Sequence, residues 1–177
     1  MSNSLSIAAV TLALRRLLDV AVPRLDPGLL GIQITTRTPD QARTNVTGES
    51  LNLFLYRAAV NAAWANLDPP RVVRPGESGL PSLALDLNYL LTAYSAEAGD
   101  ATAASHRALG AAMGALHDHP VLDGDELRAA LAGSDVHEQL ERIRVTPLPL
   151  TVDDISKLWA GSPPSTGCRW PTRSASS

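Results

Sequence analysis

Two stretches with a period of two residues constrain the fold of this chain more than any other feature. In SLNLFLYRA (50–58), leucines alternate with polar and aromatic residues. In SLALDLNYLLTAYS (82–95), they alternate with residues that include Asp86 and Asn88. Such alternation is typical of a strand with one buried face. No helical pattern lies between the two strands, which favours antiparallel pairing.

The remaining elements follow from helical spacing and turn residues. Helices are predicted over 5–22, 102–117, 124–132 and 152–160, and further strands over 31–38 and within 142–150. Pro23 ends the first helix, and Thr151 with Asp154 forms a capping-box-like start for the last. Gly110 and Gly114 lower helix propensity, and we expect close approach of that helix to the sheet to compensate.

The element order is α-β-β-β-α-α-β-α, which predicts an α+β fold with a small, mostly antiparallel sheet and helices packed on it. The 177 residues suffice for one domain, which we place at 1–160. No internal repeat is visible in the sequence.

Charge and hydropathy exclude several classes of partner. The net charge is −3 and the arginines are scattered, so no nucleic-acid surface is expected. No apolar run reaches the ~20 residues of a membrane span. Arg15 and Arg16 follow the apolar N-terminal run instead of preceding it, which favours a helix over an export signal. The single cysteine, Cys168, excludes an internal disulfide and is compatible with a reducing compartment.

The best metal-like cluster is LHDHP (116–120), where His117 and His119 flank an aspartate near a helix end. A metal-dependent hydrolase using these two histidines is one alternative function. Zinc usually takes three or four protein ligands, and the spacing of His106 and His137 matches no familiar signature. The structural interpretation is that histidine near a helix C-terminus interacts with the helix dipole. We therefore expect no catalytic residues, no metal and no cofactor.

The long connection at 59–81 is the second functional candidate. It holds four prolines and two glycines, and a loop of this length in a compact domain is usually functional. Trp64 either packs on the domain's own core or contacts a partner. A monomeric adaptor that binds one partner through this loop is therefore a further alternative.

Four motifs in this order resemble a known family: LNLFLYRAAVNAAWAN (51–66), LPSLALDLNYLLTAY (80–94), LGAAMGALHDHPVL (109–122) and ISKLW (155–159). They are similar to the cap, or tube-terminator, proteins of phage-tail-like contractile injection systems, such as virulence-cassette and antifeeding-prophage particles. The resemblance covers roughly residues 5–160.

This resemblance implies a structural protein without catalysis or cofactor. The family's proteins form a hexameric ring at the end distal to the baseplate, on the last layer of inner tube. They also engage the sheath, stop polymerisation and help to fix particle length. Assembly would be cytoplasmic, within a particle that is either retained or released from the cell.

A terminator needs contact surfaces. Our candidate is the strand face opposite the leucines, with Asn52, Phe54 and Tyr56 on one strand and Asp86 and Asn88 on the other. We call it the mixed face. We expect its rows to lie toward a subunit neighbour or the tube, the alternative being a solvated sheet face. Alanine at Asn52 and Asp86 should then weaken the ring while the monomer stays folded. The candidate interface residues are Asn52, Tyr56, Arg57, Trp64, Asn66, Asp86 and Asn88.

The tail GSPPSTGCRWPTRSASS (161–177) lacks apolar periodicity, and we expect it to be irregular. In the family, the last helix leads into a further strand. One hypothesis is a frameshift near codon 162 that replaces this strand. The alternative is a short homologue with an irregular tail.

Overall fold

The computed structural model describes six segments of the chain, and the predicted helix over 124–132 lies outside them. They are residues 6–61, 84–96, 103–122, 143–149, 151–160 and 172–174. Their elements, in chain order, are α1 (Ser6–Leu25), η1 (Pro27–Leu29), β1 (Gln33–Thr35), β2 (Ser50–Val60), β3 (Leu85–Tyr94), α3 (Ala104–Asp118), β4 (Val121–Leu122), β5 (Ile143–Arg144), α5 (Val152–Ala160) and β6 (Thr172–Ser174).

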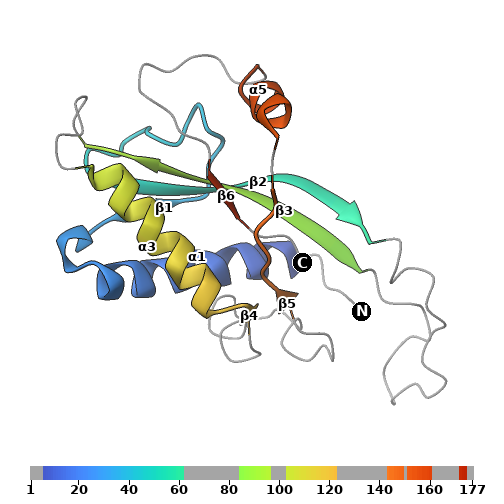
Figure 1. Cartoon of the computed structure of the whole chain (residues 1–177), viewed down its shortest axis with the longest axis horizontal. Coiled ribbons are helices and arrows are strands. Elements are labelled where there is room, and N and C mark those ends of the chain that lie inside the picture. The colour runs from blue at the N-terminus through green and yellow to red at the C-terminus, as the bar shows by residue number, and fades with distance from the viewer. Residues whose placement is uncertain are drawn as a thin grey trace.

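The main sheet has the strand order β1-β2-β3-β6, with α1 and α3 together on one side of it (Figure 1). β2 pairs antiparallel with β3, and β3 with β6, whereas the short β1 pairs parallel with β2. β4 and β5 form a separate antiparallel pair. The predicted α+β class with a mostly antiparallel sheet is confirmed, and the parallel β1 was not predicted.

The core lies between the leucine face of β2–β3 and α1. The strand register places Leu53 opposite Leu91, and both side chains are fully buried together with Leu51, Leu18 and Val22. Burying a leucine side chain contributes about 1.5–3 kcal/mol. The alternation that predicted two strands therefore also identifies the face that the helices cover.

A polar group of β3 reaches into this core. The hydroxyl of Tyr89 lies 2.8 Å from Thr11 Oγ1 of α1. Burial raises the pKa of Tyr89, and the hydrogen bond to Thr11 only partly offsets this. Tyr89 is therefore neutral at physiological pH and links the sheet to α1.

α3 approaches its neighbours through alanine rather than glycine. Its buried residues are Ala104, Ala108, Ala112, Ala115 and Leu116. Gly110 is exposed, and a Cβ built on it would meet nothing within 4 Å. At Gly114 a Cβ would meet only Leu25 Cδ1, at 3.7 Å. The expectation that these glycines allow close approach to the sheet was wrong.

Local signals placed some helix ends better than others. The predicted capping box is present: Asp154 N–H donates to Thr151 Oγ1 at 3.2 Å, and Thr151 N–H donates to the Asp154 carboxylate at 3.1 Å. α5 begins at Val152 as predicted. α1, however, continues through Pro23 to Leu25. Pro23 removes the hydrogen bond that its own N–H would have made, but the backbone hydrogen bond from the Asp26 N–H to the Val22 carbonyl, at 3.0 Å, still closes the last turn.

The tail was expected to be irregular, but Thr172–Ser174 forms β6 and pairs with Tyr89–Leu91 of β3. The expectation was therefore wrong at these three residues. The proposed division of the chain at residue 160 stays a prediction.

An ion pair joins the end of α1 to α3. Arg107 Nε and Nη2 donate to the two carboxylate oxygens of Asp26 at 2.8 and 2.6 Å. The N–H of Gly28 also donates to Asp26, at 3.0 Å. The hydrogen bond from Arg107 is the main reason that the pKa of Asp26 lies below its ordinary value.

This pKa shift makes the folding stability depend on pH. Because the folded-state pKa is lowered, the contribution of Asp26 is complete above the ordinary value of about 3.9 and is lost as the pH falls through the folded pKa. We expect Asp26→Asn to lower the urea midpoint at pH 7, and the difference from the wild type to shrink below pH 3. Asp153→Asn is the control, because its 2.6 Å pair with Lys157 is highly exposed and should contribute little. Equal differences at both pH values would contradict the assignment.

Candidate interaction surface

β2 and β3 form a ribbon whose register changes at Tyr56. Before this point Asn52 lies opposite Thr92, and after it Arg57 lies opposite Asn88. Tyr56 is thus the extra residue of a β-bulge. Strict alternation would place Tyr56 on the mixed face, but the bulge places Arg57 there instead.

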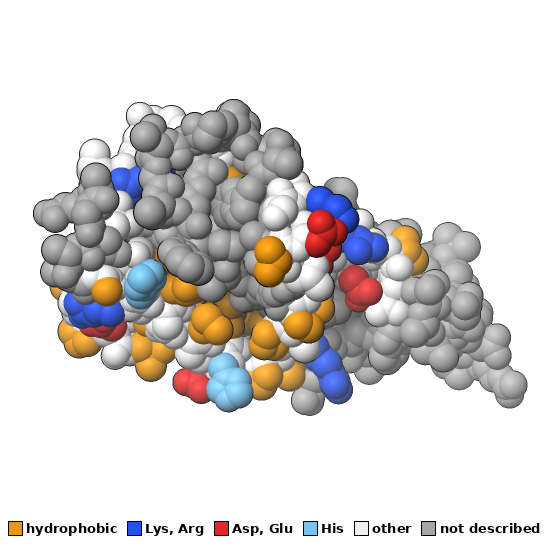
Figure 2. Space-filling model, turned by 45° about the horizontal axis from the view of Figure 1, so that its top comes forward, with side chains coloured by type: hydrophobic (Ala, Val, Ile, Leu, Met, Phe, Trp, Pro, Cys, Tyr) orange, Lys and Arg blue, Asp and Glu red, His pale blue; other side chains and the backbone are white. Residues whose placement is uncertain are grey.

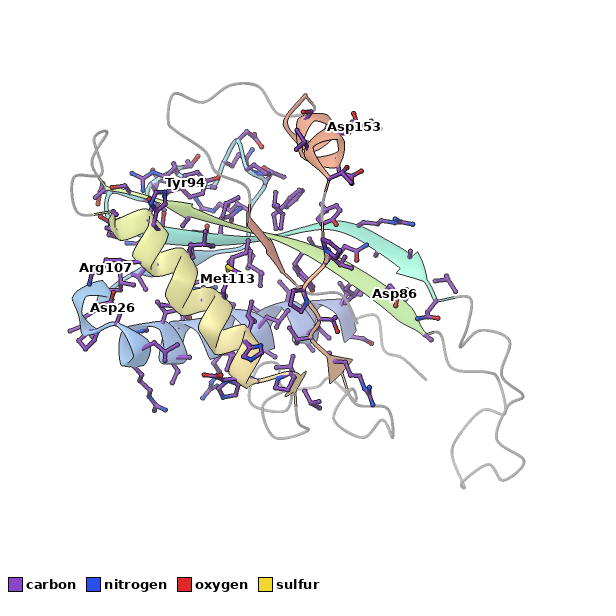
Figure 3. All side chains as sticks on the ribbon, in the orientation of Figure 1. Asp26, Asp86, Tyr94, Arg107, Met113 and Asp153 are labelled. Atoms are coloured by element: carbon purple, nitrogen blue, oxygen red, sulfur yellow. The ribbon has the colours of Figure 1, made fainter. Side chains whose placement is uncertain are left out.

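Beyond the bulge, the ribbon extends past α1 and α3 (Figure 1). We call residues 57–61 and 84–88 the ribbon end. Asp86 lies here opposite Ala59 and accepts a hydrogen bond from Asn61 Nδ2 at 2.9 Å. In Figure 3, Asp86 on the ribbon end and Asp26 after α1 lie on opposite sides of the view.

The two faces of the ribbon end carry different side chains. Arg57 is exposed on the mixed face, and Val60 on the leucine face is 55% exposed. The Arg57 side chain has no hydrogen-bond or ion-pair partner in the part of the chain that the structure describes. The ribbon end therefore exposes Arg57 on the face that also carries Asp86, and Val60 on the other face, while Leu87 and Asn88 are buried.

Asn52, by contrast, is an internal residue. It is fully buried, and its Oδ1 accepts from Thr35 Oγ1 at 2.9 Å and from the Arg37 N–H at 3.1 Å. Its Nδ2 donates to the Arg37 carbonyl at 3.0 Å. These side-chain hydrogen bonds hold β1 and the following segment against β2. Asn52 therefore has no exposed atom with which to contact another subunit.

The other candidate residues divide by their burial. Asn88 is buried, Tyr56 and Asp86 are half-buried, and Arg57 is exposed. Trp64 and Asn66 lie outside the described residues, as does most of the 59–81 loop. The structure thus brings Arg57, Asp86 and Asn88 together on one face of the ribbon end.

Sequence reasoning missed two contributors to this surface, Asn61 and Val60. Asn61 fixes the Asp86 carboxylate, and its N–H also donates to the Ala84 carbonyl at 3.0 Å. Val60 follows two alanines, which show no preference for either face. These residues can be assigned to a face only once the position of the bulge is known, and the alternation does not indicate that position.

The two histidines of the hydrolase alternative do not form a site with other described residues. His119 Nδ1 lies 2.9 Å from the Ala115 carbonyl at the end of α3, while His117 is exposed. Within the described segments, no group of three His, Cys, Asp or Glu residues could hold a metal ion. No described helix is long and apolar enough to cross a membrane.

Replacing Asn52 should affect folding, contrary to the expectation from sequence. Asn52→Ala leaves two backbone groups of Arg37 without their partner and leaves the Thr35 hydroxyl only its longer bond to the Leu51 carbonyl, at 3.3 Å. The loss should cost about 1–3 kcal/mol. Asp86→Ala removes one half-exposed hydrogen bond, and we expect a loss below about 1 kcal/mol. Urea unfolding of the two variants measures this difference. Equal destabilisation, or a stable Asn52→Ala variant, would contradict the internal role.

Comparison with solved structures supports the fold. The chain is similar to a chain from "Cryo-EM Structure of an Extracellular Contractile Injection System, PVC sheath/tube terminator in extended state", with a TM-score of 0.57 and 17% sequence identity. The match covers 99% of this chain and 58% of that chain. This chain thus spans less than two thirds of the terminator's length.

Comparison with sequences gives the family. No curated protein matches the chain. The family described as "Pvc16 N-terminal domain" matches residues 9–163, which is most of the sequence. The chain therefore belongs to the Pvc16 N-terminal domain family.

Proposed function

We propose that this chain terminates the tube and sheath of a contractile injection particle. The observation that carries the proposal is the likeness of nearly the whole chain to a sheath/tube terminator, with a family match over residues 9–163. Both findings concern fold and ancestry. The assignment of the same task to this chain is our inference.

In this proposal the chain forms a homo-hexameric ring at the end distal to the baseplate. The ring contacts the last layer of inner-tube subunits and the sheath, and it blocks further addition of either subunit. Particle length is then fixed by capping. The task is structural and requires no reaction centre, cofactor, nucleic acid or membrane span.

Assembly would take place in the cytoplasm, and the cap would leave the cell only with a released particle. The ribbon end supports a contact role, since it extends past the helices and exposes Arg57 on one face and Val60 on the other. Both are features of a surface that another subunit can cover.

Deletion of the gene tests the proposed role. Without a cap, tube and sheath growth has no defined end, so we expect particles of uncontrolled length or none at all. Electron microscopy of particle preparations measures the length distribution. Re-expression of the wild-type chain is the control and should restore a narrow distribution. Particles of normal length that still contract in the deletion strain would refute the role.

A further inference from the structure

The outer edge of β2 is open over most of its length. β1 pairs only with residues 50–52 of this 11-residue strand. The sheet order β1-β2-β3-β6 places no other strand on that side. Among the described segments, residues 53–60 of β2 therefore have a strand neighbour only on the β3 side. An open edge of this kind is a template for pairing with another extended chain.

The register gives the direction of each backbone group at the ribbon end. The Asn61 N–H donates to the Ala84 carbonyl at 3.0 Å, so Asn61 directs its backbone groups across the ribbon toward the β3 side. Successive residues of a strand direct these groups to opposite edges. Ala59 therefore also faces β3, whereas Ala58 and Val60 direct their N–H and C=O groups to the open edge.

These outward groups are accessible to another chain. Within the described residues, the backbone groups that Ala58 and Val60 direct outward have no hydrogen-bond partner. Ala58 is exposed, and Val60 is 55% exposed. The stretch LFLYRAAV (53–60) holds no proline, and its one charged residue is Arg57. Because proline and rows of charge are the usual protection of an edge, this edge is receptive to a second strand.

The mixed face of the ribbon end carries a cation and an anion. Arg57 is exposed, and its side chain has no polar partner among the described residues. The Asp86 carboxylate is held by Asn61 Nδ2 at 2.9 Å. Figure 2 shows basic, acidic and hydrophobic side chains near one another toward the right, the side on which Figure 1 shows the ribbon end. A partner strand at this edge therefore meets both signs of charge.

A second copy of the chain satisfies the open backbone groups. If a two-fold axis passes through Ala59, Ala58 of one copy pairs with Val60 of the other, and each such pair exchanges two backbone hydrogen bonds. The small Ala58 side chain then lies opposite the branched Val60 side chain on the leucine face. The pairing buries the exposed valine of both copies.

The same register brings opposite charges together on the mixed face. Arg57 of one copy lies opposite Asn61 of the other, and that Asn61 holds the Asp86 carboxylate. The guanidinium and the carboxylate therefore come close across the contact. Because the axis is two-fold, this favourable arrangement occurs twice.

We propose that two copies of the unassembled chain pair through the open edges of β2, which makes one continuous antiparallel sheet from β3 of one copy to β3 of the other. A two-fold contact uses the same surface on both copies and closes at two. It is thus different from the contacts of a six-membered ring and goes beyond the proposed function. The pairing covers an edge on which other extended chains could otherwise add.

A cysteine on the axis tests the register. Opposite residues of a non-hydrogen-bonded antiparallel pair have Cα atoms about 4.5 Å apart, which lies within the usual disulfide range of about 4.4–6.8 Å. In a Cys168→Ser background, Ala59→Cys should therefore form a cross-linked dimer under mild oxidation. Val152→Cys in the same background is the control, because this residue of α5 is 80% exposed and lies outside the proposed contact.

Proline distinguishes the open edge from the paired edge. Ala58→Pro removes an outward N–H, so β2 should still pair with β3 while the contact between copies is lost. Ala59→Pro removes an N–H that faces β3 and should destabilise the fold itself. Sedimentation velocity over a concentration series measures pairing, and circular dichroism reports whether each variant is folded.

A charge reversal tests the mixed face. Arg57→Glu places like charges beside Asp86 of the other copy, and we expect it to raise the concentration needed for pairing by about tenfold. Adding Asp86→Arg reverses both charges, so R57E/D86R should recover wild-type pairing. Arg144→Glu makes the same charge change at an exposed position of β5 and should pair as the wild type does.

Three results would overturn the proposal: a wild-type chain that stays monomeric throughout the series, an Ala59→Cys chain that cross-links no more than Val152→Cys, or a folded Ala58→Pro chain that still pairs. A chain that is monomeric alone but binds a tube or sheath subunit through this edge would assign the edge to that subunit instead. The deletion experiment is independent, because particles of normal length would remove the terminator role and leave the pairing in place.

Discussion

The antiparallel pairing of β2 with β3 is the interaction on which the rest of the structure depends. It places the leucines of both strands on one face, where Leu53 lies opposite Leu91. That face gives α1 and α3 a surface to cover, and removing its leucines from water favours packing of the layers. The parallel strand β1 and the short β6 add to the two edges of this pair.

The same pairing also produces the exposed part of the molecule. At one end, Asn52 and its bonds to Thr35 and Arg37 tie the ribbon into the domain. Past the bulge at Tyr56 the ribbon extends beyond the helices, and the side chains of Arg57 and Val60 are exposed. One continuous ribbon therefore serves as core at one end and as a candidate contact surface at the other.

Local signals in the sequence predicted much of this fold. The period of two at 50–58 and 82–95 identified both long strands, and the capping box of Thr151 and Asp154 placed the start of α5, because these signals involve residues close in sequence. Asn52 could not be assigned in this way. Its partners Thr35 and Arg37 are 15 or more residues away, so its internal role appears only when β1 lies beside β2.

The interaction surface was predicted only in part, for a related reason. Alternation places Tyr56 on the mixed face, but a bulge shifts every residue after it by one position. The stretch that follows contains Ala58 and Ala59, whose small side chains give no preference for either face. Arg57 and Asp86 were identified as candidates, whereas Val60 and Asn61 were not.

Membership of the Pvc16 N-terminal domain family and the fold make a capping role the central claim of this account. The most direct measurement is the position of the chain on intact particles, by electron microscopy of an epitope-tagged chain labelled with gold. The account predicts label at a single end of each extended particle, opposite the baseplate. Label along the sheath, at the baseplate end, or absent from intact particles would contradict it.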